Sequence, residues 1–124
     1  MLSKTKMVAV RKGIESLYSG ICTITEHQKY LKENKSTGFK DVVVLENQPC
    51  RLSFEKITST NQTESASSLI QTTKLFIAPE IQIKPGSKIT VTQNGVTTEY
   101  KRTGEPAIYE THQEIILELF KGWS

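Results

Sequence analysis

The stretch from Leu75 to Leu119 constrains the fold more than any other part of the chain. It opens as LFIAPEIQIKPGSKITV and closes as VTTEYKRTGEPAIYETHQEIILEL, so short apolar runs alternate with turn signals. Asn94-Gly95 between two alternating segments is the strongest short-range signal for a β-hairpin. The KPGS segment at 84–87 has proline and glycine at the two central positions of a type II turn. Several short strands at this spacing predict a small barrel or sandwich.

The strands expected within this stretch are short. One covers Leu75-Phe76-Ile77, and beyond Pro79 another contains Ile81 and Ile83. Gly104-Glu105-Pro106 is expected to turn the chain once more. The final strand then places four side chains on one face, because strand side chains alternate with period two: Gln113, Ile115, Leu117 and Leu119.

Period-two patterning also runs through the first half of the chain. Cys22 and Ile24 share one strand face, with Thr23, Thr25 and His27 on the other. The polar stretch KYLKENKSTGFK indicates a hairpin tip, and the return strand carries the apolar run at 42–45. Pro49 is expected to break the ladder, since proline donates no hydrogen bond, before alternation resumes in a final set of apolar residues: Cys50, Leu52 and Phe54. Phe39, Phe54 and Phe76 are expected in the core.

An amphipathic helix is predicted over residues 1–17. Met7, Val10, Ile14 and Leu17 recur at helical spacing, and Ser3 has the hydroxyl of a good N-cap. The apolar stripe must pack on something. The first expectation is the protein's own barrel, and the second is a neighbouring subunit.

The segment Ile57–Thr73, ITSTNQTESASSLIQTT, is almost entirely polar and carries one charge, Glu64. It offers too little apolar surface to offset the entropy cost of ordering, so a mobile loop is expected. Loops of this length in small domains are either functional or surface insertions. Both readings stay open: a floppy insertion, or a loop that reaches a partner or a channel.

Length and composition favour one domain over residues 1–124, with a mainly β barrel at 18–120. The sequence has no apolar run of the roughly 20 residues that a membrane span requires, and its first residues have no signal-peptide pattern. Two cysteines, Cys22 and Cys50, build neither a disulfide framework nor a four-ligand zinc site. Reduced, buried thiols and a cytoplasmic folding site are therefore expected.

Charge is divided unevenly along the chain. Residues 1–40 have a net charge of +5 and residues 41–124 a net charge of −2. Such asymmetry can mark complementary subunit surfaces or a face turned toward nucleic acid. It also fits an ordinary solvated helix and hairpin, since the basic residues are not interleaved with aromatics along the sequence.

No reaction is indicated by the residues. His27 and His112 are the only histidines, and neither has metal-ligand spacing to a cysteine or forms a nucleophile–base pattern. No glycine-rich phosphate loop is present. We expect no enzyme activity, no metal and no cofactor. Trp123 is either an exposed anchor for a partner or a ring folded back on the barrel. A small nucleic-acid-binding barrel is the alternative function, with the KENK hairpin at 32–35 touching phosphate.

Three segments together resemble a known pattern: NQPCRLSF at 47–54, TKLFIAPEIQIKPGSKITV at 73–91 and EPAIYETHQEIILEL at 105–119. In order and spacing over roughly 18–120, the chain is similar to head–tail connector proteins of tailed phages and prophages of Gram-positive bacteria, in the minor capsid or head-completion stopper group. It departs from the commonest form at Ser87 and Lys88, where an acidic residue is frequent, and in its longer N-terminal helix.

The resemblance implies a structural role in the virion neck, after assembly in the host cytoplasm. Copies would form a ring, a dodecamer by the family's symmetry, under the portal or adaptor. The ring would close the DNA channel after packaging and dock the tail-completion protein, with no membrane involved. The 57–73 loop would project into the channel, with six residues as candidates to line it: Glu64, Ser65, Ser67, Ser68, Leu69 and Ile70. Arg11, Lys12 and Trp123 are the candidate interface residues.

Overall fold

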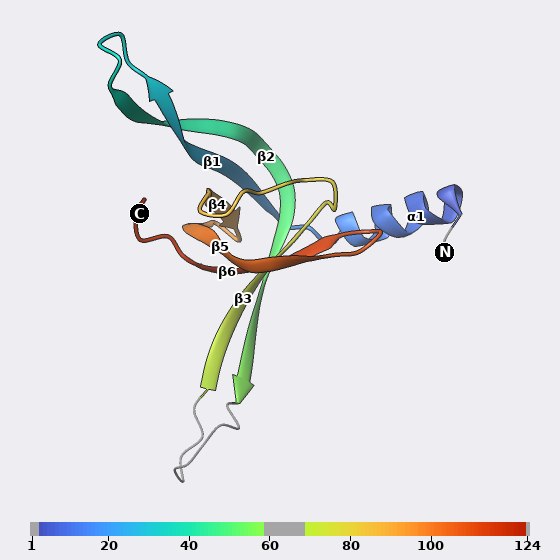
Figure 1. Ribbon diagram of the computed structural model, residues 1–124. Coiled ribbons are helices and arrows are strands. Elements are labelled where there is room, and N and C mark those ends of the chain that lie inside the picture. The colour runs from blue at the N-terminus through green and yellow to red at the C-terminus, as the bar shows by residue number, and fades with distance from the viewer. Residues whose placement is uncertain (1–2, 59–68, 124) are drawn as a thin grey trace.

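The computed structural model describes residues 3–58 and 69–123. They form a closed antiparallel barrel in the order β1-β2-β3-β6-β5-β4, with one N-terminal helix, as the sequence predicts (Figure 1). The elements are α1 (Lys4–Glu15), β1 (Gly20–Leu31), β2 (Thr37–Thr58), β3 (Leu69–Ile77), β4 (Lys88–Gln93), β5 (Val96–Ile108) and β6 (Gln113–Leu119). The barrel closes where β4 pairs with β1, from Gly20 opposite Gln93 to Thr25 opposite Lys88.

The barrel interior is filled by alternate residues of every strand. Its core cluster consists of Cys22, Ile24, Cys50, Leu52, Leu75, Ile77, Ile83, Ile89, Val91, Tyr100, Ile115 and Leu117. The predicted face of β6 is confirmed for Gln113, Ile115 and Leu117, whereas Leu119 at the end of the strand is 56% exposed. Period-two alternation therefore sets which side chains face inward.

Two of the predicted turns are confirmed by their backbone geometry. Asn94 and Gly95 both have positive φ, 55° and 76°, as a type I′ hairpin turn requires. In the KPGS segment, Gly86 has φ 84° and the Ser87 N–H donates to the Lys84 carbonyl over 3.1 Å. The KENK hairpin also forms, with Lys35 at φ 66°.

Pro49 does not break the ladder, contrary to the sequence expectation, because β2 runs without interruption from Thr37 to Thr58. The strand changes partner at this point: Pro49 lies opposite Ile21 of β1, while pairing with β3 begins at Cys50, opposite Ile77. Pro49 thus has a neighbour on one side only, where a missing N–H is tolerated. A bulge beside it, with Asn47 at φ 53°, lets β2 bend (Figure 1).

Two other local predictions are wrong. The 104–106 segment is no turn but an irregularity within β5, where three residues face one on β6 and Gly104 has φ 73°. The region of Ile81 and Ile83 is no strand but part of the connection from β3 to β4. The buried Gln113 amide fixes this connection by donating to the carbonyls of Ala78 and Ile81, and Arg102 donates to the Ile83 carbonyl over 2.7 Å.

Two hairpin arms extend beyond the barrel (Figure 1). In the β1–β2 arm, residues 26–31 pair with 37–42 and have no other strand beside them among the described residues. In the β2–β3 arm, residues 55–58 pair with 69–72. The expected loop at 57–73 is therefore wrong at both ends, which belong to strands. Ile57 lies opposite Ile70, Thr58 lies opposite Leu69, and β3 continues to Ile77. The loop residues 59–68 lie outside the described part.

Helix α1 is shorter than predicted, and it is not packed on the barrel. Ser3 is the N-cap, accepting the Lys6 N–H over 3.2 Å, and the helix ends at Glu15, with Ser16 as its C-cap. No helix residue is buried: in the apolar stripe, Val10 and Leu17 are 41% and 64% exposed, and Met7 and Ile14 are only partly buried. The expectation that the stripe covers the protein's own barrel is therefore wrong. No helix in the described part has the length and apolar character to cross a membrane.

Both cysteines are buried free thiols inside the barrel, as expected. The expected face of Thr25 is wrong, because a register shift between Ile24 and Thr25 turns its side chain inward, to 8% exposure. The expectation that Phe39, Phe54 and Phe76 lie in the core is also wrong. Phe39 on the β1–β2 arm and Phe54 on the barrel part of β2 are 53% and 54% exposed, and Phe76 is only partly buried and lies outside the core cluster.

Candidate functional site

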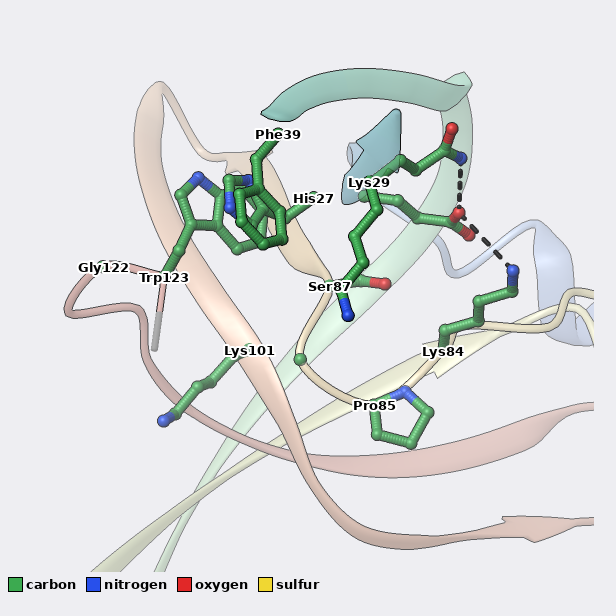
Figure 2. A pocket seen from close by; sticks show the side chains of 12 residues that line it. His27, Lys29, Phe39, Lys84, Pro85, Ser87, Lys101, Gly122 and Trp123 are labelled. Carbon is green, nitrogen blue, oxygen red and sulfur yellow. Dashed lines mark hydrogen bonds and ion pairs between the residues drawn. The ribbon is translucent and has the colours of Figure 1, made fainter. Parts of the chain in front are cut away.

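A stack of three rings marks the base of the β1–β2 arm. The His27 imidazole lies between Phe39, with ring centroids 4.8 Å apart and planes at 5°, and Trp123, at 4.7 Å and 12°. Phe39 and His27 come from the paired strands of the arm, whereas Trp123 comes from the segment after β6 (Figure 2). Trp123 also meets the Phe120 ring edge-on at 4.8 Å. The Trp123 ring is therefore folded back on the barrel.

The Asp41 carboxylate contacts the edge of the middle ring of the stack. Its Oδ1 lies 3.0 Å from His27 Nδ1, directly across the strand pair. The hydrogen bond from His27, a further one from the Trp123 indole and the charge of Lys88 lower the pKa of Asp41 below its usual value. Lys88 Nζ lies 5.7 Å from the Trp123 ring centroid and 5.4 Å from that of Phe120. The cation over these rings adds a further attraction.

A cleft of about 580 Å³ opens between this stack and the turn at 84–87. Lys29 points into it toward Ser87, and Pro85 lies on the facing wall (Figure 2). On the other side, Lys84 lies 3.7 Å from Glu26, whose side chain is only 13% exposed. The cleft thus combines aromatic rings with an excess of cationic side chains.

The opposite face of the same arm has a second aromatic–lysine group. Tyr30 lies across from Gly38, and a Cβ there would come within 2.8 Å of the Tyr30 ring and 2.6 Å of Lys32 Cε. Only glycine leaves room for that ring to lie across the strand. Lys40 Nζ lies 5.6 Å from the Tyr30 ring centroid. Lys29 on the first face lies opposite Phe39. Lysines and aromatics are therefore interleaved across the strands, which the linear sequence conceals.

The three candidate interface residues do not come together in one site. Arg11 lies 3.0 Å from Glu80 and 3.4 Å from Glu15, so it ties the helix to the β3–β4 connection. Lys12 is exposed in the last helical turn. Trp123 lies in the ring stack at the base of the arm.

The six candidate channel residues are only partly placed. Glu64, Ser65, Ser67 and Ser68 lie outside the described residues, while Leu69 and Ile70 open β3 and pair with Thr58 and Ile57. The two histidines have different partners. His112 Nε2 lies 3.1 Å from Glu114, and the His112 ring stacks on Tyr109 with ring centroids 4.9 Å apart. Across residues 3–58 and 69–123, no three metal-ligating side chains converge.

These observations define a class: a small closed six-stranded antiparallel barrel with two projecting hairpin arms and an exposed N-terminal helix. Among solved structures, the chain is similar to the phage-like element PBSX protein XkdH from Bacillus subtilis, with 14% identity and a TM-score of 0.48 over 80% of this chain and 91% of XkdH. The chain therefore resembles a protein of a phage-like element, but a likeness at this level carries no argument about function. No protein-family model matches the chain. No curated protein matches it either.

Proposed function

We propose that this chain is a structural head–tail joining protein of a phage or prophage. Copies form a ring under the portal or adaptor, close the DNA channel and dock the tail-completion protein in the virion neck. The connector-like sequence pattern carries the proposal. Its motifs fall on four of the barrel strands: PCRLSF on β2 where that strand changes partner, KLF on β3, PGSKITV leading into β4, and HQEIILEL leading into and along β6.

The exposed helix supports a ring. A 12-residue helix is marginal in water without tertiary packing, yet Val10 and Leu17 of the apolar stripe are exposed, and Met7 and Ile14 are only partly buried. A neighbouring copy would cover the stripe. Ring contacts join different patches of one molecule, and the charges fit: α1 carries four basic residues against Glu15, while residues 99–118 carry five glutamates against Lys101 and Arg102.

The β2–β3 arm supports the channel role. Its two paired strands extend beyond the barrel as far as Thr58 and Leu69, the two positions between which a channel loop would have to start (Figure 1). Small, polar, nearly uncharged residues can line a pore without gripping DNA. In this proposal, Leu69 and Ile70 form the base of the loop, because they open β3. The candidates to line the channel are then Glu64, Ser65, Ser67 and Ser68.

Ring formation is tested by native mass spectrometry and negative-stain microscopy of the full chain at assembly concentrations. Val10→Glu places a charge in the stripe and is expected to abolish rings. Val8→Glu is the matched control, because Val8 is 53% exposed on another face of the helix. A chain that stays monomeric with its portal partner present contradicts the proposal. Genes for capsid and tail proteins beside this one would support it.

The channel role has its own test. Replacing residues 59–68 by a short Gly-Ser link keeps every residue of the core cluster, so the melting temperature is expected to stay nearly constant. In phage assembly, the same change should release packaged DNA from filled heads. Filled heads that stay sealed would contradict the channel-closing role while leaving the ring intact.

A further inference from the structure

The lysines of the β1–β2 arm differ from those of the barrel wall. Lys74, Lys84, Lys88 and Lys101 each lie 3.1–3.7 Å from a carboxylate. In the described part of the chain, none of the four arm lysines is within 4.0 Å of one: Lys29, Lys32, Lys35 and Lys40. Over the whole arm, residues 26–42, these four lysines stand against three carboxylates. Of the three, Glu26 lies 3.7 Å from Lys84 and Asp41 lies 3.0 Å from His27. Four lysines without a described carboxylate within 4.0 Å therefore lie together on one projecting element.

We propose that the β1–β2 arm is a nucleic-acid-binding ribbon that contacts the phosphate backbone without reading its sequence. The ligand chemistry is the phosphodiester strand, which duplex DNA and single-stranded DNA share. The inference does not depend on the ring or on a place in a virion, since a single barrel presents the whole arm.

The shape of the arm fits this ligand. It is a two-stranded antiparallel ribbon with no further strand beside it in the described part of the chain, and it extends clear of the barrel (Figure 1). A ribbon of two strands is an element that the major groove of B-DNA admits. Lysines on both faces of such a ribbon reach phosphates on both sides: Lys29 on one face, Lys32 and Lys40 on the other.

The aromatic residues add a second contact. One face of Phe39 stacks on His27, and the ring is still 53% exposed. An unpaired base can stack on the remaining face, which duplex DNA does not offer. Aromatic platforms beside a basic track are the usual equipment for single-strand binding. An acidic protein surface is the competing occupant. The exposed ring between lysines and the ribbon shape favour nucleic acid.

The experiment measures fluorescence anisotropy of a labelled 30-base-pair duplex, and of an oligothymidine of equal length, titrated with the full chain between 50 and 200 mM salt. Three phosphate contacts on duplex DNA correspond to a salt slope of about −2.7, or about 40-fold in affinity over this range. The triple variant Lys29→Gln, Lys32→Gln, Lys40→Gln should lose nearly all of this slope.

The matched control is Lys4→Gln, Lys6→Gln, Lys121→Gln, which lowers the net charge by the same three units away from the arm. It is expected to keep the slope to within about one phosphate contact. Phe39→Leu should weaken the oligothymidine by at least about fivefold and leave the duplex unchanged. Circular dichroism verifies folding of each variant.

Three results would overturn the inference. They are no DNA binding by the unmodified chain at 50 mM salt, equal losses in the two triple variants, or protection of the arm lysines from acetylation by a second copy and not by DNA. Equal losses would assign any binding to net charge alone. None of these results bears on ring formation, which the mass measurements decide separately.

Discussion

The side-chain amide of Gln93 bonds to both backbone groups of Leu52, and in this way it extends barrel closure past the last β1–β4 pair. Leu52 N lies 2.8 Å from Gln93 Oε1, and Gln93 Nε2 lies 3.3 Å from the Leu52 carbonyl. β2 has already left β1 at this level, because β1 begins at Gly20, opposite Cys50. The glutamine side chain thus replaces a missing stretch of strand.

Gln93→Leu is expected to destabilise the barrel by about 1–3 kcal/mol, because the Leu52 N–H and carbonyl are left without partners in a part-buried site. For a chain of 124 residues, that corresponds to a fall of several degrees in melting temperature, at roughly 4 °C per kcal/mol. Gln82→Leu, on the exposed β3–β4 connection, is the control. Equal melting temperatures for the two variants would show that the Gln93 bonds do not stabilise closure.

Ile115 and Ile116 are adjacent isoleucines on opposite faces of β6, 1% and 45% exposed. Ile115→Ala should cost about 2–5 kcal/mol, since it leaves a cavity in the core. Ile116→Ala should cost well under half as much. Urea denaturation measures both. Similar midpoints would contradict the assignment of the strand's faces.

The ion pair between Arg11 and Glu80 should make the position of α1 depend on pH. The hydrogen bond that the Glu80 carboxylate accepts from Arg11 lowers the pKa of Glu80 below the usual value near 4.5. A carboxyl group whose folded pKa is lowered stabilises the structure above its unfolded pKa, and this contribution disappears as the pH falls through the folded value. Contact between α1 and the β3–β4 connection is therefore expected to persist near pH 7 and to weaken below about pH 4.5.

Amide chemical shifts around Glu80, followed from pH 7 to pH 2.5, measure this loss. Arg11→Gln should show the low-pH shifts already at pH 7, whereas Lys12→Gln, one residue along the same helix, should behave as the unmodified chain. An unchanged spectrum in Arg11→Gln would mean that the pair does not hold the helix.

Trp123 is the only tryptophan in the chain, so its fluorescence reports on the ring stack. His27→Ala removes the ring between Phe39 and Trp123 and should shift the emission to longer wavelength as the indole becomes solvated. His112→Ala removes the other histidine, which stacks on Tyr109 on another part of the barrel, and should leave the emission unchanged. A red shift in the control alone would contradict the described stack.

The two thiols should react slowly in the native protein. Both side chains are at most 1% exposed, so a reagent reaches them only when the barrel opens. The hydrogen bond with Cys50, together with burial, also raises the pKa of the Cys22 thiol above its usual value. Titration with a thiol reagent in denaturant, without reductant, should count two free thiols, and the native chain should react at least about tenfold more slowly. Finding no free thiol in denaturant would mean a disulfide.

Local signals predicted the turns at 84–87 and 94–95 and most inward-facing residues, because these features depend on neighbours in sequence. Asn94-Gly95 needs only its own φ angles, and Ile115 only the period of its strand. The errors arise where distant pairing decides. Pro49 is tolerated because β2 changes partner beside it, and Phe39 is exposed because its strand pair leaves the barrel. The ring stack was not foreseen either: His27, Phe39 and Trp123 come together only through strand register and the fold of the C-terminal segment.

β2 belongs to both arms, and this has a mechanical consequence. The strand runs 22 residues from the tip of the β1–β2 arm, through the bend beside Pro49, into the β2–β3 arm. Tension between the two tips would therefore follow covalent backbone bonds from end to end. The tension would load the hydrogen bonds between β2 and its neighbours in shear, parallel to the strands. In this geometry many hydrogen bonds must break at the same time. A barrel threaded in this way can be pulled at both ends without being opened.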